Sequence, residues 1–381
     1  MSVLGECSVE DFLRDYWQKR PLLIRGAIPG FEGPVDEHDL AGLATETWMT
    51  SRLVFEHGGE RPWEVRNGPF RDDEMRSLPD GGWSLLVHAV DHAVPEVNSL
   101  RDRFSFIPNW RTDDIMVSFA PPGSGVGPHL DNYDVFLLQG KGRKLWRIGL
   151  QPTRAEEFLP GLDLRILACP RFDAEWEVGP GDMIYLPPHF AHHGVAITPS
   201  LTYSIGFRAP NWRDAMADLV SHVFETEDPS EFYTDPSLAL QDDPGQISPA
   251  ALSAVTKTIR ARFDDPDMMA LWFGRYVTTP AYALPDTAPL QISVTEVVQR
   301  WRYSGFIFRA EGTRVSYALL DSGVALFADG VSSMHPPATL PAIVELCRAT
   351  RFAYRPDHPW LVNPDCRTLF GDWLASGVLY L

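Results

Sequence analysis

Cysteine is scarce in this chain of 381 residues. The four cysteines are scattered and include no CxxC pair: Cys7, Cys169, Cys347 and Cys366. We therefore expect reduced thiols in a cytoplasmic protein. The first residues also lack the basic-then-apolar pattern of a secretory signal peptide, which agrees with a cytoplasmic location.

Long apolar runs and an excess of basic residues are missing as well. No stretch approaches the length that crosses a bilayer, so we expect no membrane association. Lysine and arginine number 33 against 51 aspartates and glutamates, which gives a formal net charge of −18. Such a chain repels phosphate, so we expect no direct binding of nucleic acid. A basic protein partner is compatible with this charge, and solubility alone is the simpler explanation.

The chain divides into three parts by its sequence texture. Ser8 is a plausible N-cap of a short helix that we expect to end at Pro21, before a strand at LLIRGA. From Trp83 to Phe207, short β-like runs alternate with Gly and Pro turns, which indicates a sandwich or barrel. Residues 211–285 contain two segments with helical periodicity, RDAMADLVSHVFE and SPAALSAVTKTIRARF. Residues 286–381 indicate a small module of helices around a hairpin.

One segment, PHLDNYDVFLLQGKGRKLWRIG, places a histidine two residues before an aspartate. Side chains at i and i+2 of a strand point to the same face, so we expect His129 and Asp131 to share a cavity. The later segment GDMIYLPPHFAHHG supplies candidates for a third ligand: His189, His192 and His193. Two imidazoles and one carboxylate form the facial triad of non-haem Fe(II) oxygenases, which leaves three metal positions open.

A 2-oxo acid can fill two of these positions and dioxygen the third. If the 2-oxo acid carries a distal carboxylate, that carboxylate needs a buried cation in a dry barrel. Arg143 and Lys144 are adjacent, so on a strand they face opposite sides and only one can enter the cavity. The alternative is that both are surface charges.

Two other features are weaker. His88 and His92 are four residues apart and could chelate zinc on a helix, but the glutamate of an HExxH motif is missing. The C-terminal module shows no basic recognition stripe, so we expect it to be structural rather than DNA-binding.

Four stretches together resemble a known family: FLRDYWQKRPLLIRGAI, GVGPHLDNYDVFLLQGKGRKLWRIG, YLPPHFAHHGV and YSIGFRAP. They are similar to the JmjC-type 2-oxoglutarate oxygenases, and more narrowly to the bacterial ribosomal oxygenases, which hydroxylate C3 of an arginine in ribosomal protein L-16. The resemblance implies a mainly β fold with helices. Its parts would be a double-stranded β-helix (cupin/JmjC) catalytic domain over 1–210, a helical dimerisation domain over 211–285 and a winged-helix-like C-terminal domain over 286–381.

The resemblance also implies roles for individual residues. Fe(II) would be bound by His129, Asp131 and His192, with 2-oxoglutarate and dioxygen as cosubstrates. Lys144 would bind the C5 carboxylate of 2-oxoglutarate, a role that arginine fills in some relatives. No family role falls on His189 or His193, which we expect at the surface or behind the ligands.

For the substrate, Asp114, Met116 and Ser118 share one face of a predicted strand, and Tyr133 is the next residue on the face of His129 and Asp131. A guanidinium needs a carboxylate at its head and flat or soft apolar surface along its stem. The resemblance places the substrate arginine among Asp114, Met116 and Tyr133, with Ser204 as a further hydrogen-bond partner. The alternative is that Met116 and Tyr133 are core and Asp114 is solvated.

Several alternative functions stay open from sequence. The same oxygenase chemistry could act on another target, as a histidine hydroxylase or an N-methyl-lysine demethylase. The barrel could instead hold Zn or Mn in an isomerase or hydrolase, or be a non-oxidative metal-binding cupin. With the helical region as its interface, we expect a homodimer whose substrate partner is ribosomal protein L-16.

Overall fold

The computed structural model describes residues 2–57, 62–153, 157–226, 228, 230–284 and 293–381. In its N-terminal part, helices pack against one face of a sheet. Helix α1 (Val9–Asp15) begins at Ser8, as expected, because the Ser8 hydroxyl accepts the Asp11 N–H at 3.0 Å. It ends at Asp15, so the prediction that it reaches Pro21 was wrong. There follow β1 (Leu22–Ile24), α2 (Glu37–Leu43), β2 (Ser51–Glu56), β3 (Trp63–Asn67), α3 (Asp72–Arg76), β4 (Trp83–Val87), α4 (Val90–Ala93), α5 (Pro95–Asn98), η1 (Ser99–Phe104) and η2 (Asn109–Arg111).

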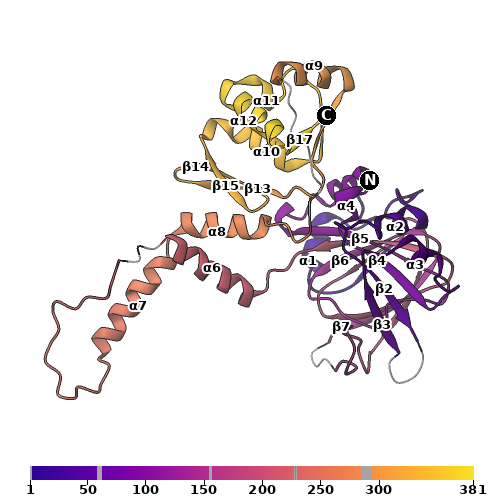
Figure 1. Ribbon diagram of the computed structural model, residues 1–381, viewed down its shortest axis with the longest axis horizontal. Helices are drawn as coiled ribbons and strands as arrows, with labels where there is room; N and C mark the ends of the chain where they lie inside the picture. Colours follow the sequence, from indigo (N-terminus) through magenta and orange to yellow (C-terminus); the bar gives the residue numbers. More distant parts are fainter. Residues whose placement is uncertain (1, 58–61, 154–156, 227, 229, 285–292) are drawn as a thin grey trace.

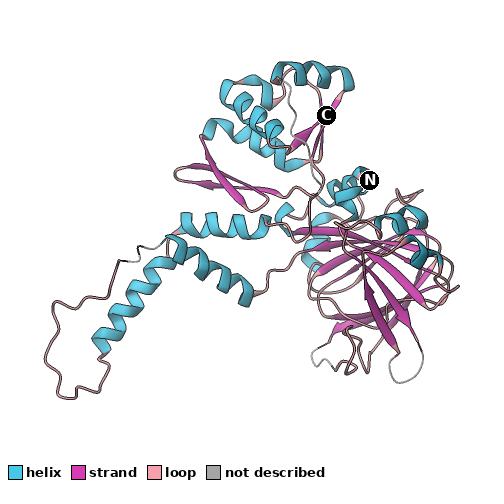
Figure 2. Ribbon diagram, in the orientation of Figure 1, coloured by secondary structure: helices cyan, strands magenta, loops and turns pink. Residues whose placement is uncertain are grey.

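Two facing sheets form the centre of this part (Figure 2). The strands that complete them are β5 (Thr112–Ala120), β6 (Asp134–Lys141), β7 (Lys144–Pro152), β8 (Ala174–Val178), β9 (Met183–Leu186), β10 (Phe190–Ala196) and β11 (Ser200–Phe207). The larger sheet has the order β1-β9-β6-β11-β5-β4-β2-β3, and the smaller has the order β10-β7-β8. The antiparallel sandwich that encloses a cavity confirms the expected mainly β, cupin-like fold.

Apolar side chains alternate between the two faces of the larger sheet. Between the sheets, Val135 and Leu137 of β6 pack with Trp146 and Ile148 of β7. On the opposite face, Phe136 packs under the N-terminal helix, with the Phe12 ring centroid 5.6 Å away. This alternation follows from the two-residue period of a strand, and it leaves the space between the sheets for a site.

The HxD segment departs from the prediction. Strand β6 begins at Asp134, so His129, Asp131 and Tyr133 lie in the loop that precedes it. The strand placement was therefore wrong for these three residues, although all three line one cavity, as expected. His129 is instead held by an isolated antiparallel bridge to His192 of β10. That bridge, rather than the alternation of side chains along a strand, brings the HxD segment next to His192.

Three helices follow the barrel: α6 (Trp212–Thr226), α7 (Pro249–Phe263) and α8 (Pro266–Thr278). The first two confirm the predicted helical segments, and they project from the body of the molecule as an arm (Figure 1). Large apolar side chains on this arm are exposed to solvent, among them Trp212 at 78% and Phe224 at 75% exposure. Within the described ranges, no helix is long and apolar enough to cross a membrane.

The C-terminal part has its own core and two small sheets. Its elements are α9 (Val294–Ser304), β12 (Phe306–Arg309), β13 (Val315–Leu320), β14 (Gly323–Ala328), β15 (Val331–His335), η3 (Pro337–Thr339), α10 (Leu340–Arg348), β16 (Arg351–Ala353), α11 (Pro359–Val362), α12 (Pro364–Ala375) and β17 (Leu379–Tyr380). Trp301, Trp360 and Phe370 are fully buried in this core. Strands pair in the orders β16-β12-β17 and β13-β14-β15. The predicted helices around a hairpin are confirmed.

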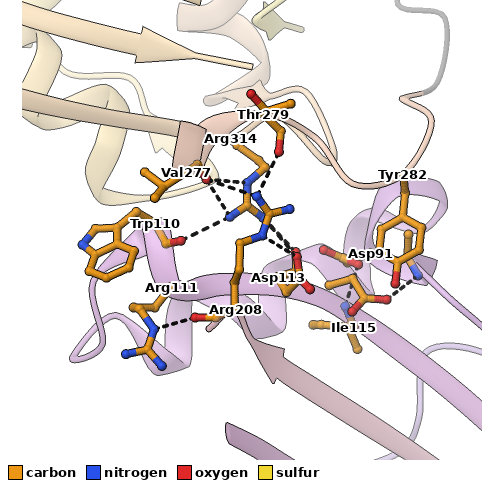
Figure 3. Close-up of polar contacts among 12 residues, drawn as sticks. Asp91, Trp110, Arg111, Asp113, Ile115, Arg208, Val277, Thr279, Tyr282 and Arg314 are labelled. Atoms are coloured by element: carbon orange, nitrogen blue, oxygen red, sulfur yellow. Dashed lines mark hydrogen bonds and ion pairs between the residues drawn. The ribbon is translucent and has the colours of Figure 1, made fainter. Parts of the chain in front are cut away.

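A buried arginine joins the three parts of the chain (Figure 3). The Arg314 guanidinium donates to the Val277 carbonyl in the last turn of α8 and to the Trp110 and Asp113 carbonyls of the barrel part. Arg208, which follows β11, donates to Asp113 Oδ1 at 3.2 Å and to the Thr279 carbonyl at 3.0 Å. These contacts fix the segment after α8 against the barrel.

Candidate active site

Two histidines and one aspartate converge at the mouth of the barrel. His129, Asp131 and His192 each offer one ligand atom, and these atoms all lie within 4.8 Å of one another. His192 Nε2 is 3.5 Å from Asp131 Oδ2, and the two imidazole centroids are 4.2 Å apart. Among the described residues, this is the one group of three or more such side chains close enough to hold a metal ion.

Backbone contacts orient both imidazoles. The main chains of His129 and His192 exchange two hydrogen bonds, of 3.0 and 2.9 Å. His129 Nδ1 lies 2.9 Å from the Gly127 carbonyl, and His192 Nδ1 lies 3.0 Å from the Phe190 carbonyl. A carbonyl only accepts, so each Nδ1 carries the proton and each Nε2 keeps a free lone pair. Burial, followed by the neighbouring His129, lowers the pKa of His192 to about 4, which keeps this imidazole neutral.

The other two histidines of the motif lie apart from the cluster. His189, after the Pro-Pro corner, is exposed and has a φ of 67°. Its N–H donates to the Asp131 carbonyl at 2.8 Å, which ties the corner to the HxD loop. His193 follows His192 on β10 and points to the opposite face, where its ring lies 6.4 Å from that of Phe172. The structure therefore places both beside the cluster rather than in it.

A cavity of about 310 Å³ opens beside the three residues. Of the residues singled out in the sequence, eight line it: Met116, Ser118, His129, Asp131, Tyr133, Lys144, His192 and Ser204. The antiparallel register of β5 and β11 pairs Met116 with Ser204 and Ser118 with Thr202, so these four side chains form one patch of the wall. This volume suits a small cosubstrate together with one inserted side chain.

Lys144 enters the cavity and Arg143 does not. The Lys144 side chain is 7% exposed, lies 4.8 Å above the Trp146 ring and approaches Thr202 Oγ1 at 3.5 Å. Across the described ranges it has no carboxylate within ion-pair distance, and burial lowers its pKa to about 8. Arg143 lies on the outer face, where it pairs with Glu177 at 2.8 Å.

Asp114 lies behind the cavity wall, two residues before Met116 on β5. It is 7% exposed, and its Oδ2 accepts the Ala89 N–H at 2.9 Å and lies 3.4 Å from His88 Nδ1. Burial opposes its ionisation, but these contacts hold the pKa of its carboxyl below the ordinary value. Its Oδ1 receives no hydrogen bond from the described residues.

Several residues of the site were missed in the sequence. Arg52, Trp146 and Thr202 line the cavity. Behind its wall, His88 contacts both Arg52 and the Tyr282 hydroxyl. Thr202 could have been found, because it lies two residues before Ser204 on the same strand face. No local signal marks Arg52 or Tyr282, which come from β2 and from the segment after α8. His88 and His92 do not chelate along a helix, since His88 precedes α4.

Comparison with known proteins agrees with this geometry. A family model described as "JmjC domain" matches residues 99–215. Over 334 residues the chain is 36% identical to the ribosomal protein uL16 3-hydroxylase of Escherichia coli, a match that covers 86% of each chain. A probable ribosomal oxygenase of Haemophilus influenzae is 41% identical over 58% of this chain and 54% of its own length.

A solved structure resembles the whole chain. It is that of YcfD, a ribosomal oxygenase from Escherichia coli, in complex with cobalt and 2-oxoglutarate. The TM-score is 0.85 at 31% sequence identity, and the match covers 99% of this chain and 98% of the other.

Proposed function

The chain belongs to the bacterial ribosomal oxygenases of the JmjC type, and we propose that it is an Fe(II)- and 2-oxoglutarate-dependent hydroxylase of C3 of an arginine in ribosomal protein L-16. One observation carries the proposal: a cluster of two histidines and an aspartate shares a cavity with a buried lysine that has no counter-charge among the described residues. The E. coli relative, named for its action on uL16, supports the choice of substrate.

The donor set fits Fe(II). His129 and His192 would bind through Nε2, because hydrogen bonds to main-chain carbonyls occupy both Nδ1 atoms, and Asp131 would bind through its carboxylate. Neutral imidazoles are the form that coordinates a metal. Bound Fe(II) would supply the activation of dioxygen, in which 2-oxoglutarate is oxidised to succinate and CO₂ and one oxygen atom enters a C–H bond of the substrate.

Lys144 would hold the distal carboxylate of 2-oxoglutarate. A buried ammonium is costly unless a charge of opposite sign accompanies it, and a dicarboxylate brings that charge into the cavity. Thr202 Oγ1 lies beside Lys144 Nζ and offers a second polar contact. The buried Trp146 Nε1 has no hydrogen-bond partner in the described part of the chain. The donors at this end of the cavity thus match an anionic group.

The substrate arginine would enter between the cluster and Asp114. Met116 and the Tyr133 ring flank the path and offer soft and flat surface to its aliphatic stem. The free Oδ1 of the ionised Asp114 would accept from the guanidinium, and Ser204 would supply another hydrogen bond. A rigid acceptor at a fixed distance from the metal would select one carbon of the side chain for reaction.

We further propose a homodimer formed through the bare apolar faces of the arm, with 1–210 as catalytic domain, 211–285 as dimerisation domain and 286–381 as a winged-helix-like domain of structural role. Monomeric proteins rarely leave such side chains as Trp212, Met216 and Phe224 uncovered along one helix. We place the protein in the cytoplasm, where ribosomal proteins are made, with no part in nucleic-acid binding. Its acidic surface would speed the capture of a basic ribosomal protein, an effect that salt weakens.

Succinate formation tests the proposed function. Purified protein with Fe(II), ascorbate and 2-oxoglutarate should release succinate faster when a peptide from L-16 with its arginine is added. The same peptide with the arginine replaced by lysine or histidine serves as the control. A preference for the histidine peptide or for a methylated lysine would replace the arginine assignment. Absence of any 2-oxoglutarate turnover would point to a non-oxidative cupin.

A further inference from the structure

The Asp114 carboxylate is held in place by a turn that follows β4. Ala89, in this turn, adopts a left-handed backbone with φ of 54° and donates its N–H to Asp114 Oδ2. That conformation is unfavourable for a residue other than glycine, so surrounding contacts must maintain it. In return, Asp91 Oδ1 accepts the N–H of Ile115, the residue after Asp114, at 2.8 Å (Figure 3). These two hydrogen bonds therefore hold the segment of Ala89 and Asp91 against β5 and fix the position of the Asp114 carboxylate.

His88 lies at the centre of a second set of contacts. Arg52 Nη2 is 3.1 Å from His88 Nε2. A guanidinium only donates, so Nε2 must accept and the proton of the imidazole is on Nδ1. That Nδ1 lies 3.1 Å from the Tyr282 hydroxyl oxygen and 3.4 Å from Asp114 Oδ2. Arg52 therefore fixes His88 as a donor that faces Tyr282 and Asp114.

Tyr282 closes this cluster from the other half of the chain. Its ring stacks on the His88 imidazole at 5.6 Å with an interplanar angle of 21°. Because His88 donates to the Tyr282 oxygen, the hydroxyl proton is free to point elsewhere. Burial and then the charge of Asp114 raise the pKa of Tyr282, so this tyrosine stays protonated.

The cluster is continuous with the cavity. Arg52 and Tyr133 both line the cavity, and Arg52 contacts His88 directly. Tyr133 shares the cavity wall with Asp131 of the candidate metal site and with Arg52, which contacts His88, so it links the two clusters along the path of an inserted side chain.

We propose that His88 and Tyr282 are positioning residues that hold Asp114 for the guanidinium of the substrate, so that substrate selection depends on residues outside the JmjC segment 99–215. The inference rests on the proposed function and deepens it. Tyr282 belongs to the segment that Arg208 and Arg314 fix against the barrel. The part of the chain after the helical arm therefore completes the substrate pocket.

Steady-state kinetics of the full-length protein test the inference. Tyr282→Phe keeps the stacked ring and removes only the hydroxyl. We expect it to raise the KM for the arginine peptide about tenfold, the factor for one lost hydrogen bond of about 1.4 kcal/mol. The KM for 2-oxoglutarate and the slow turnover of 2-oxoglutarate without peptide should stay unchanged. Tyr276→Phe is the matched control, because that ring stacks on Trp272 and its hydroxyl makes no hydrogen bond within the described ranges.

Histidine variants separate positioning from folding. His88→Ala should raise the peptide KM at least as much as Tyr282→Phe does. His88→Asn should restore part of the loss, since the asparagine amide can donate from near the position of Nδ1. The parent protein could be active on the arginine peptide while Tyr282→Phe and His88→Ala both keep its KM for that peptide. That result would overturn the positioning inference and leave the proposed function intact. A parent protein that decarboxylates 2-oxoglutarate but hydroxylates no arginine peptide would overturn the proposed function as well.

Discussion

Replacing Lys144 by alanine should raise the 2-oxoglutarate concentration for half-maximal turnover by about two to three orders of magnitude. The lysine is 7% exposed and lacks a carboxylate partner in the described part of the chain, so a bound dicarboxylate would form a buried ion pair with it. Removing one partner of such a pair costs roughly 3–5 kcal/mol, and each 1.4 kcal/mol is about tenfold in affinity. Lys144→Arg should keep much of the affinity, because the cation survives.

The pH dependence follows from the pKa of about 8 that burial gives Lys144. In the ligand-free protein, the ammonium loses its proton as the pH rises through about 8. The affinity for 2-oxoglutarate should therefore fall about tenfold for each pH unit above that value. Lys144→Met should lack this dependence, because it has no proton to lose.

As the pH rises, the stability of the ligand-free protein should increase while its affinity for 2-oxoglutarate falls. Folding lowers the pKa of Lys144 from 10.5 to about 8, so below pH 8 the charged lysine opposes folding, and the penalty disappears as the pH rises to 10.5. This lowering of the pKa corresponds to about 3 kcal/mol of folding free energy. Lys144→Met should therefore unfold at higher denaturant concentration than the ligand-free parent at pH 7.

Isothermal titration of 2-oxoglutarate into protein loaded with a redox-inert divalent metal measures the affinity, and urea unfolding measures the stability. Arg143→Ala is the matched control, because that neighbour pairs with Glu177 on the outer face. Unchanged 2-oxoglutarate affinity in Lys144→Ala, or a loss in Arg143→Ala of the same size, would refute the assignment.

Three further variants test the rest of the site. Loss of a hydrogen-bond partner of a metal ligand typically lowers metal affinity or activity roughly 10–100-fold. His192→Ala should lower turnover and metal affinity by more than this, whereas His193→Ala should keep most of both. Equal losses in the two variants would contradict the ligand assignment. Asp114→Asn should lower turnover of the arginine peptide at least about 100-fold while metal and 2-oxoglutarate binding persist; parental peptide kinetics would exclude it as the guanidinium acceptor. Phe224→Asp should convert the dimer into monomers at micromolar concentration in sedimentation, and a parent protein that is itself monomeric would contradict the proposed interface.

Much of the fold was predictable because strand periodicity and turn residues are local signals. The short apolar runs gave the strands of the two sheets, and the helical periodicity of 213–225 and 248–263 gave α6 and α7. Because successive side chains of a strand alternate between its faces, the sequence also predicted that only one of Arg143 and Lys144 enters the cavity. Which of the two does so depends on the pairing of β7 with β8 and β10, and that register is not local.

The convergence of the metal cluster has a different origin from the one that the sequence suggested. His129 and Asp131 lie in a loop, and the bridge to His192 brings them together. The cluster behind the substrate pocket could not be found by any motif, because Arg52, His88 and Tyr282 come from three distant segments. The pairing of β2 with β4 places Arg52 beside His88, and the packing of the segment after α8 against the barrel adds Tyr282.

The most direct test of the proposed chemistry is tandem mass spectrometry of ribosomal protein L-16 after reaction in isotopically labelled dioxygen. The protein, Fe(II), 2-oxoglutarate and ascorbate should add one labelled oxygen atom to L-16, and fragmentation should place it on C3 of a single arginine. His192→Ala should leave L-16 unlabelled. Label on a histidine, loss of a methyl group from lysine, or no label despite succinate release would contradict arginine hydroxylation.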